Sequence, residues 1–125
     1  MNKTKILIDT HVLLWILSNS KKLKEIFWIK NYSFYVVSPL SFLEMQYLHE
    51  CRKISIQVIK VVEQMRKDTR FLIDSPDFEK VFLAAMNLSW TRDPFDRLLV
   101  AHSLVQNLPF ATCDRVILSH HVLVV

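Results

Sequence analysis

Hydrophobic positions along the chain follow two different spacings, which predict alternating buried strands and amphipathic helices. Short continuous apolar runs predict strands at 5–8, 34–37, 71–73, 110–112 and 122–125. Apolar residues at helical spacing predict helices at 10–17, 20–30, 39–52, 55–67, 76–88 and 94–106. Strands separated by helices imply a parallel sheet covered on both faces. We therefore expect an α/β fold with three layers, α/β/α, around a mainly parallel sheet of about five strands.

Helix boundaries are predicted from capping residues. Ser38-Pro39, Ser75-Pro76 and Asp93-Pro94 each place a polar N-cap before a proline suited to the first helical position. Asn107 follows the last predicted helix and is expected to take the left-handed conformation that ends it.

Composition limits the class of protein. The 125 residues fit one domain, 1–125, and the 51% of hydrophobic residues are enough for a core. The chain has no glycine, which excludes a P-loop, a dinucleotide-binding fingerprint and a nucleophile elbow. Cys51 and Cys113 have no zinc-site spacing, so we expect buried, reduced thiols.

The start of the chain argues against a secretory signal or a membrane span. Asp9 and His11 interrupt the first apolar run, and the uncharged run at 12–17 is far too short to cross a bilayer. We therefore expect a cytoplasmic protein that does not enter a membrane.

Acidic residues fall at informative places in this pattern. Asp9 ends the first predicted strand, and Asp114 follows the fourth. Asp96 lies in the first turn of the helix that begins at Pro94. Ligand sites in parallel sheets form beyond the carboxyl ends of the strands, so these carboxylates can converge there.

Glu44 lies within an apolar helix face. The residues that predict this face are Leu40, Leu43, Tyr47, Leu48 and Cys51. A carboxylate on the same side needs compensation for its charge. Together with Asp9, Asp96 and Asp114 it forms a set of oxygen ligands that suits Mg²⁺ or Mn²⁺.

The charge balance supports an acidic pocket in a basic protein. The net charge is +4, and removing Asp9, Glu44, Asp93, Asp96 and Asp114 leaves +9 for the rest. A metal-dependent nuclease needs acids that hold a cation and basic groups that hold phosphates. The candidate phosphate contacts are His11, Arg92, Arg97 and Arg115.

Each acid also has a purely structural interpretation. Asp9, Asp93 and Asp114 can be helix N-caps, and capping is the favoured role for Asp93. Asp96 can complement a helix dipole, and Glu44 can pair with a buried Arg or Lys. Each of these structural roles is reasonable for a single acid. Chance alone is a weaker explanation for the placement of all four acids, Asp9, Glu44, Asp96 and Asp114, at one end of the sheet.

Four segments resemble the PIN domain family, in the branch that contains VapC-type toxins with a DPFDR motif. These segments are LIDTHVLLW at 7–15, SFLE at 41–44, DPFDRLL at 93–99 and ATCDR at 111–115. They follow the family order across nearly the whole chain. Asn107 replaces a common glycine, and His120-His121 replace a common Tyr-Gly turn, where we expect solvated side chains.

The resemblance implies a metal-dependent endoribonuclease that uses Mg²⁺ or Mn²⁺. Asp9, Glu44, Asp96 and Asp114 match the family's acidic quartet, with Asp9 and Asp96 as direct metal ligands. Thr10 and Thr112 match hydroxyl positions that support these acids, and Asp93 is the extra acid of this branch. Substrate phosphate contacts by His11, Arg97 and Arg115 are further expectations. For His11, packing against a neighbour is equally open, and His49 and His102 are expected to be packed or exposed helical histidines.

The resemblance also implies partners: an RNA substrate, a cognate antitoxin protein and a second copy in a homodimer. The alternative is a PIN-fold module that binds RNA or protein without catalysis. A third possibility is an unrelated α/β interaction domain in which the acids are only caps.

Overall fold

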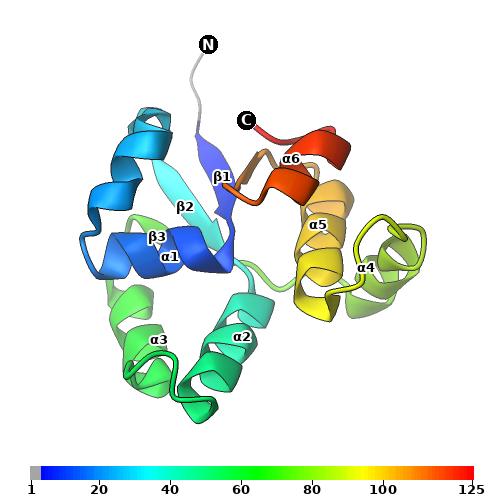
Figure 1. Cartoon of the computed structure of the whole chain (residues 1–125). Helices are drawn as coiled ribbons and strands as arrows, with labels where there is room; N and C mark the ends of the chain where they lie inside the picture. The colour runs from blue at the N-terminus through cyan, green and yellow to red at the C-terminus, as the bar shows by residue number, and fades with distance from the viewer. Residues whose placement is uncertain (1–3) are drawn as a thin grey trace.

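The fold is built on a parallel sheet with helices on both faces, as seen in the computed structural model, which describes residues 4–125 (Figure 1). The strands are β1 (Lys5–Ile8), β2 (Phe34–Val37), β3 (Phe71–Ile73) and β4 (Phe110–Ala111). Their order in the sheet is β3-β2-β1-β4, and every neighbouring pair is parallel. The predicted α/β class with three layers is confirmed.

The fifth strand expected at 122–125 is wrong. This segment forms one isolated parallel bridge, between Phe110 and Val124, with Phe110 N–H donating to the Leu123 carbonyl. Strand β4 is only two residues long, so a fifth strand beside it would have few backbone groups to pair with.

Within residues 4–125, seven helical segments connect and follow the strands. They are α1 (Thr10–Leu17), the 3₁₀ segment η1 (Lys21–Asn31), α2 (Pro39–Glu50), α3 (Val58–Lys67), α4 (Phe78–Ala85), α5 (Pro94–Gln106) and α6 (Arg115–His120). In the part of the chain that the structure describes, none of them has the length and apolar character needed to cross a membrane.

Several predicted helices differ from the structure in form or in their bounds. The segment predicted at 20–30 is the kinked 3₁₀ segment η1 (Lys21–Asn31), in which Ile26 has non-helical φ/ψ values of −128° and 38°. Helices α2 and α4 end earlier than expected, at Glu50 and Ala85. Helix α3 begins at Val58, three residues later than expected. Helix α4 begins at Phe78 because Asp77, and not Ser75, caps it by accepting hydrogen bonds from Glu79 N and Lys80 N.

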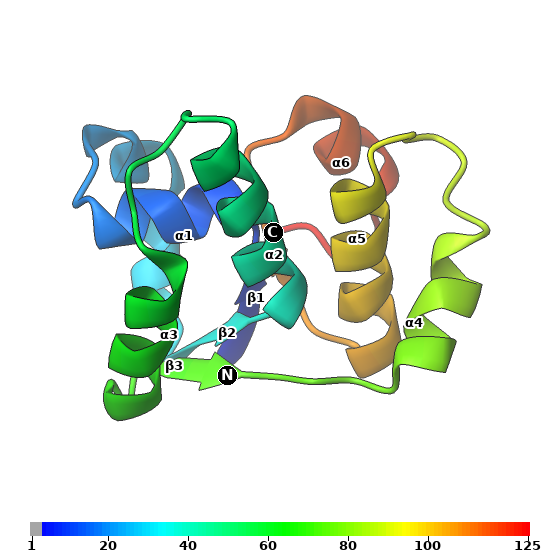
Figure 2. The same ribbon diagram turned by 90° about the horizontal axis from the view of Figure 1, so that it is seen from below.

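Alternation along β1 places core residues on both faces of the sheet. Ile6 and Ile8 pack with α1, η1, α2 and α3, whereas Leu7 packs with α5 and α6. Helix α4 packs on the outer side of α5 (Figure 2). Asn107 ends α5 in the left-handed region, at φ 51° and ψ 48°, as predicted.

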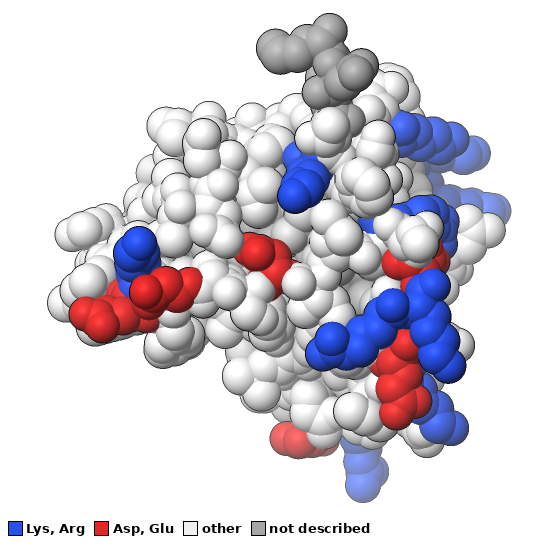
Figure 3. Space-filling view, turned by 180° about the vertical axis from the view of Figure 1, so that it is seen from behind, with Lys and Arg blue, Asp and Glu red and all other residues white. Residues whose placement is uncertain are grey.

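Charge is unevenly spread on the face seen from behind. Lys and Arg side chains gather on the side of α3, whereas Asp and Glu side chains are prominent over α4 (Figure 3). Helix α3 carries exposed Lys60, Arg66 and Lys67.

Candidate active site

Asp9 is the buried acid at the carboxyl end of β1. Only 3% of its surface is exposed. Its Oδ1 accepts a 2.8 Å hydrogen bond from Thr10 N, and its Oδ2 accepts a 2.7 Å hydrogen bond from the Thr112 hydroxyl. Burial raises the pKa of Asp9, and the hydrogen bonds and the nearby His11 ring oppose that rise only in part.

Asp114 joins this site through the backbone that follows β4. Ile8 and Ala111 are paired in the parallel sheet, so the residues after each strand lie beside one another. The Asp114 N–H donates to the Thr112 hydroxyl oxygen at 3.0 Å, and the same hydroxyl donates to Asp9. Asp114 Oδ1 also caps α6, accepting from Val116 N at 2.9 Å and Ile117 N at 3.1 Å.

His11 is held by protein groups on both sides of its ring. Its Nε2 accepts a 3.0 Å hydrogen bond from Cys113 N, and its Nδ1 lies 3.4 Å from Asp9 Oδ2. The ring also meets Trp15 edge-on, with centroids 5.0 Å apart. This geometry supports the packing role for His11, and contact with a substrate phosphate stays a prediction.

Asp93 and Asp96 enter the site from the first turn of α5. Asp93 is the N-cap, as predicted, and its Oδ1 accepts from Phe95 N at 2.8 Å and Asp96 N at 3.2 Å. Burial is the largest cause that raises the pKa of Asp96 to about 7, and the neighbouring carboxylates of Asp93, Asp9, Asp114 and Glu44 contribute to the same rise. The structure therefore brings the other four acids within electrostatic reach of Asp96.

Glu44 reaches the site from α2. Its Oε1 is buried and has no hydrogen-bond partner. Burial raises the pKa of Glu44; the Thr10 hydroxyl opposes this effect, and the carboxylates of Asp9 and Asp93 add to it. No Lys or Arg within residues 4–125 forms an ion pair with any of the five acids, so the alternative in which Glu44 pairs with a buried Arg or Lys finds no such partner there.

The predicted apolar face of α2 is wrong in its orientation. Leu43 is 59% exposed and Tyr47 is 53% exposed, and Cys51 is also exposed instead of buried. The side that faces the core carries Ser41 and Met45. The small Ser41 is accommodated because its hydroxyl accepts a 3.1 Å hydrogen bond from Thr10.

The basic candidates Arg92, Arg97 and Arg115 form no ion pair with the acids within residues 4–125. Arg97 Nη2 donates to the Met86 carbonyl at 3.4 Å, and its Nε is buried without a hydrogen-bond partner. Arg92 and Arg115 are exposed. Their roles in binding phosphate stay predictions.

The five acids supply the oxygen ligands that a hard divalent cation prefers, but their side chains are not arranged as a preformed metal site. In the described chain, residues 4–125, no group of three or more His, Cys, Asp or Glu side chains is arranged to hold a metal ion. The donor set is made of oxygen atoms, which Mg²⁺ and Mn²⁺ prefer. The unpartnered Glu44 Oε1 and the raised pKa of Asp96 both mark negative charge that a cation would compensate.

Two buried histidines were missed by the sequence interpretation. His102 is fully buried on α5, and its Nε2 lies 2.7 Å from Asp74 Oδ2. His121, expected in solvent, is buried, and its Nε2 lies 2.9 Å from the Ser103 hydroxyl. Both partners are distant in sequence, so no local pattern could have indicated the pairs.

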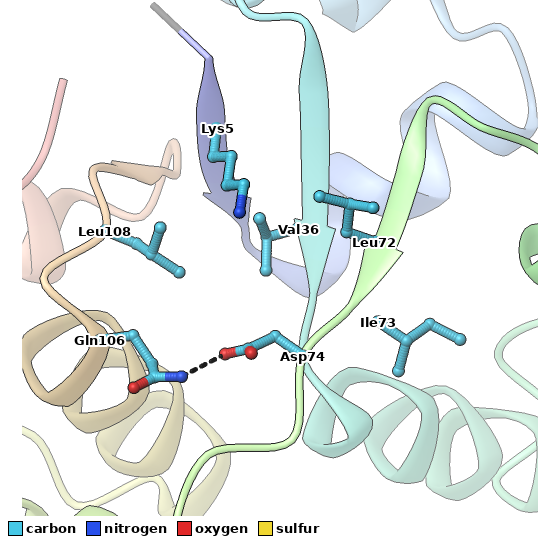
Figure 4. Close-up of a pocket in the computed structure, with 7 residues that line it drawn as sticks. All are labelled: Lys5, Val36, Leu72, Ile73, Asp74, Gln106 and Leu108. Carbon is cyan, nitrogen blue, oxygen red and sulfur yellow. Dashed lines mark hydrogen bonds between the residues drawn. The ribbon is translucent and has the colours of Figure 1, made fainter.

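Asp74 also borders a pocket separate from the five acids (Figure 4). This pocket has a volume of about 290 Å³ and is lined by Lys5, Val36, Leu72, Ile73, Asp74, Gln106 and Leu108. Gln106 Nε2 donates to Asp74 Oδ2 at 3.0 Å. Burial alone would raise the pKa of Asp74, but the hydrogen bonds from Gln106 and His102 outweigh it and lower that pKa. Asp74 is thus held by two neutral or cationic neighbours, Gln106 and His102.

The parallel sheet and the acids at its carboxyl edge define a PIN-type domain. The PIN domain profile matches residues 6–120. Because this match covers most of the chain, the chain belongs to the PIN domain family. No curated protein matches it in sequence.

Two solved structures have a similar fold. A chain of VapBC2 from Rickettsia felis, a structure bound to a DNA fragment from its promoter, aligns with a TM-score of 0.64 and 14% identity over 97% of this chain and 96% of that chain. A chain of VapBC-1 from nontypeable Haemophilus influenzae aligns with a TM-score of 0.58 and 15% identity, covering 89% of this chain and 87% of that chain. At these identities the likeness shows the fold alone.

Proposed function

We propose that this chain is a metal-dependent endoribonuclease and the toxin of a toxin–antitoxin pair. The observation that carries the proposal is the convergence of five carboxylates from four parts of the chain, without a Lys or Arg ion pair within residues 4–125. Such a concentration of like charge is costly unless a ligand compensates it. Membership of the PIN domain family supports the same conclusion.

Asp9 and Asp96 would be the direct ligands of Mg²⁺ or Mn²⁺. Glu44 would bind the ion or orient its water, and Asp114 would complete the set. When bound, the ion would lower the pKa of a water molecule and neutralise charge on the scissile phosphate. No side chain of the site needs to act as a covalent nucleophile, and hydrolysis would leave a 5′-phosphate and a 3′-hydroxyl.

The chain's own residues would hold these ligands in position. Thr112 and Thr10 N–H fix the two oxygens of Asp9. Since His11 Nε2 accepts from Cys113 N, its Nδ1–H is free to face Asp9 Oδ2. Partners that restrain a ligand in this way tune its affinity for the metal.

The proposed partners are an RNA substrate, a cognate antitoxin protein and a second copy of this chain. The antitoxin is supported by the fold shared with chains of two VapBC structures. A cytoplasmic location is the corresponding expectation for an RNA target.

The test is cleavage of a mixed, labelled RNA pool by purified protein in Mn²⁺ or in EDTA. We expect cutting by the wild type in Mn²⁺ only, and none by Asp96→Asn. Glu63→Gln, which makes the same chemical change on the exposed side of α3, should cut like the wild type. Folded protein that binds RNA but cuts nothing would instead support the non-catalytic binding module.

A further inference from the structure

An aromatic pair, made of the exposed Tyr47 and the half-buried Phe95, bridges the two helices that border the acid cluster. The rings of Tyr47 on α2 and Phe95 on α5 have centroids 6.1 Å apart and are tilted by 38°. Helices α2 and α5 pack against each other (Figure 2). Tyr47 is 53% exposed, so the face of its ring is only partly covered by Phe95.

This pair lies directly beside the carboxylates. Tyr47 follows Glu44 by about one helical turn, and Phe95 precedes Asp96. Asp93 Oδ1 accepts a 2.8 Å hydrogen bond from Phe95 N, so the ring that contacts Tyr47 belongs to a residue bonded to one of the five acids.

Core packing does not account for the exposed side of α2. Leu43 lies one turn before Tyr47 and is 59% exposed, so the two form an apolar stripe on the solvent side of the helix. Apolar surface bordered by charged groups is typical of a binding site. Because acidic residues border this apolar stripe, a ligand that binds there would meet both apolar and charged groups.

The same helix leads to basic groups. Arg52 and Lys53 are exposed just beyond its carboxyl end, beside an open hollow of about 630 Å³ that they line with His49. Arg52 has φ 59°, a left-handed value that is unfavourable for a residue with a Cβ. The helical rise puts Glu50, the last residue of α2, roughly 9 Å along the axis from Glu44, and Arg52 follows two residues later.

We infer that Tyr47 and Phe95 form a stacking platform for a nucleobase of single-stranded RNA next to the scissile phosphate. Arg52 and Lys53 would contact phosphates further along the same strand. Aromatic side chains that stack bases, next to cationic groups that follow the backbone, are the usual means of holding single strands. This inference rests on the proposed function, and it assigns Tyr47 as a positioning residue for the substrate.

The test measures binding in the Asp96→Asn background, with Ca²⁺, so that the strand stays intact. The probes are a fluorescein-labelled 20-nucleotide single-stranded RNA of mixed sequence and an abasic strand of equal length and charge. We expect Tyr47→Ala to weaken binding of the RNA about 5- to 100-fold and to leave binding of the abasic strand unchanged. Tyr47→Phe keeps the ring and should bind like the parent.

Phe27→Ala is the matched control, because Phe27 on η1 is 68% exposed and is not part of the pair. Equal losses for RNA and for the abasic strand would overturn the stacking role, as would equal losses for Tyr47→Ala and Tyr47→Phe. Unchanged RNA binding by Tyr47→Ala would also overturn it; a loss of antitoxin binding in that variant would then assign the face to a protein.

The wild-type protein separates this inference from the proposed function. If the wild type cuts RNA, if Tyr47→Ala alone cuts like the wild type, and if Tyr47→Ala in the Asp96→Asn background binds like its parent, only the stacking platform is wrong. If the wild type neither cuts nor binds any strand, the nuclease and the platform are both wrong.

Discussion

The Thr112 hydroxyl donates a 2.7 Å hydrogen bond to Asp9 Oδ2 and so joins the ends of two neighbouring parallel strands. The same hydroxyl accepts from Asp114 N, which places a second residue of the acid cluster on one short network. Asp9 is nearly fully buried, so this hydroxyl is one of few groups that can stabilise its charge. The network fixes where the central carboxylate points.

Replacing Thr112 with Val should therefore weaken both the fold and the site. Removing the donor leaves a buried carboxylate oxygen with one partner fewer, which should lower the free energy of unfolding by about 1–3 kcal/mol. The affinity for Mn²⁺ should fall roughly 10- to 100-fold. Urea denaturation and calorimetric Mn²⁺ titration measure the two effects. Thr112→Ser keeps the hydroxyl donor, so its free energy of unfolding and its affinity for Mn²⁺ should stay near those of the wild type. A Thr112→Val variant that binds Mn²⁺ as tightly as the wild type would contradict this role.

Asp96 should destabilise the metal-free protein as the pH rises. Its pKa is raised from 3.8 to about 7 in the folded state. Between these values the folded state keeps a proton that the unfolded state releases, so rising pH favours unfolding. In EDTA, Asp96→Asn should have a higher Tm than wild type at pH 8, by on the order of a few degrees, and a similar Tm at pH 4. Thermal unfolding followed by circular dichroism tests this, and an equal gain at both pH values would argue against it.

Added Mn²⁺ should reverse that destabilisation. A ligand at a hundred times its Kd raises the free energy of unfolding by about 2.7 kcal/mol if it binds only the folded state. The gain in Tm should be larger at pH 8 than at pH 5, because Mn²⁺ must displace the proton that Asp96 holds at the lower pH. Glu63→Gln should show the wild-type gain and Asp96→Asn little or none. A gain that does not depend on pH would place the ion elsewhere.

His102 should make the fold sensitive to acid. Burial lowers its pKa, although the Asp74 carboxylate opposes this. Below its ordinary value of 6.5, the unfolded chain takes up a proton that the buried ring resists, so stability is lost as the pH falls. His102→Gln should therefore lose less stability than wild type between pH 7 and pH 5, measured by urea denaturation. The exposed His120, replaced by Gln, is the control. An unchanged pH profile in His102→Gln would show that another group controls acid unfolding.

Much of the fold could be predicted because the strands are short and consist mainly of consecutive apolar residues. The segments 5–8 and 34–37 are strands in the structure as predicted, and the Asp93-Pro94 start and the Asn107 end of α5 follow from capping rules. The 3₁₀ form of η1 and the single bridge at Val124 depend on packing, which apolar spacing does not reveal.

The acid cluster could be predicted because carboxyl ends of parallel strands share one edge of the sheet. The orientation of α2 could not, because apolar residues occupy more than one side of that helix. Spacing favoured the side of Leu43 and Tyr47, whereas the structure buries Met45 and turns those two outward. The observed orientation of α2 has a consequence for the site, because it leaves the aromatic ring of Tyr47 exposed beside the acids.

The most direct test of the account compares wild type with Asp9→Asn for Mn²⁺ binding and RNA cleavage on the same samples. Circular dichroism should confirm that both proteins are folded. We predict that the wild type binds Mn²⁺ and cuts labelled RNA, that EDTA stops the cutting, and that Asp9→Asn loses both properties. Cleavage that persists in EDTA, or in a folded Asp9→Asn variant that no longer binds Mn²⁺, would contradict a metal-dependent nuclease built on these carboxylates.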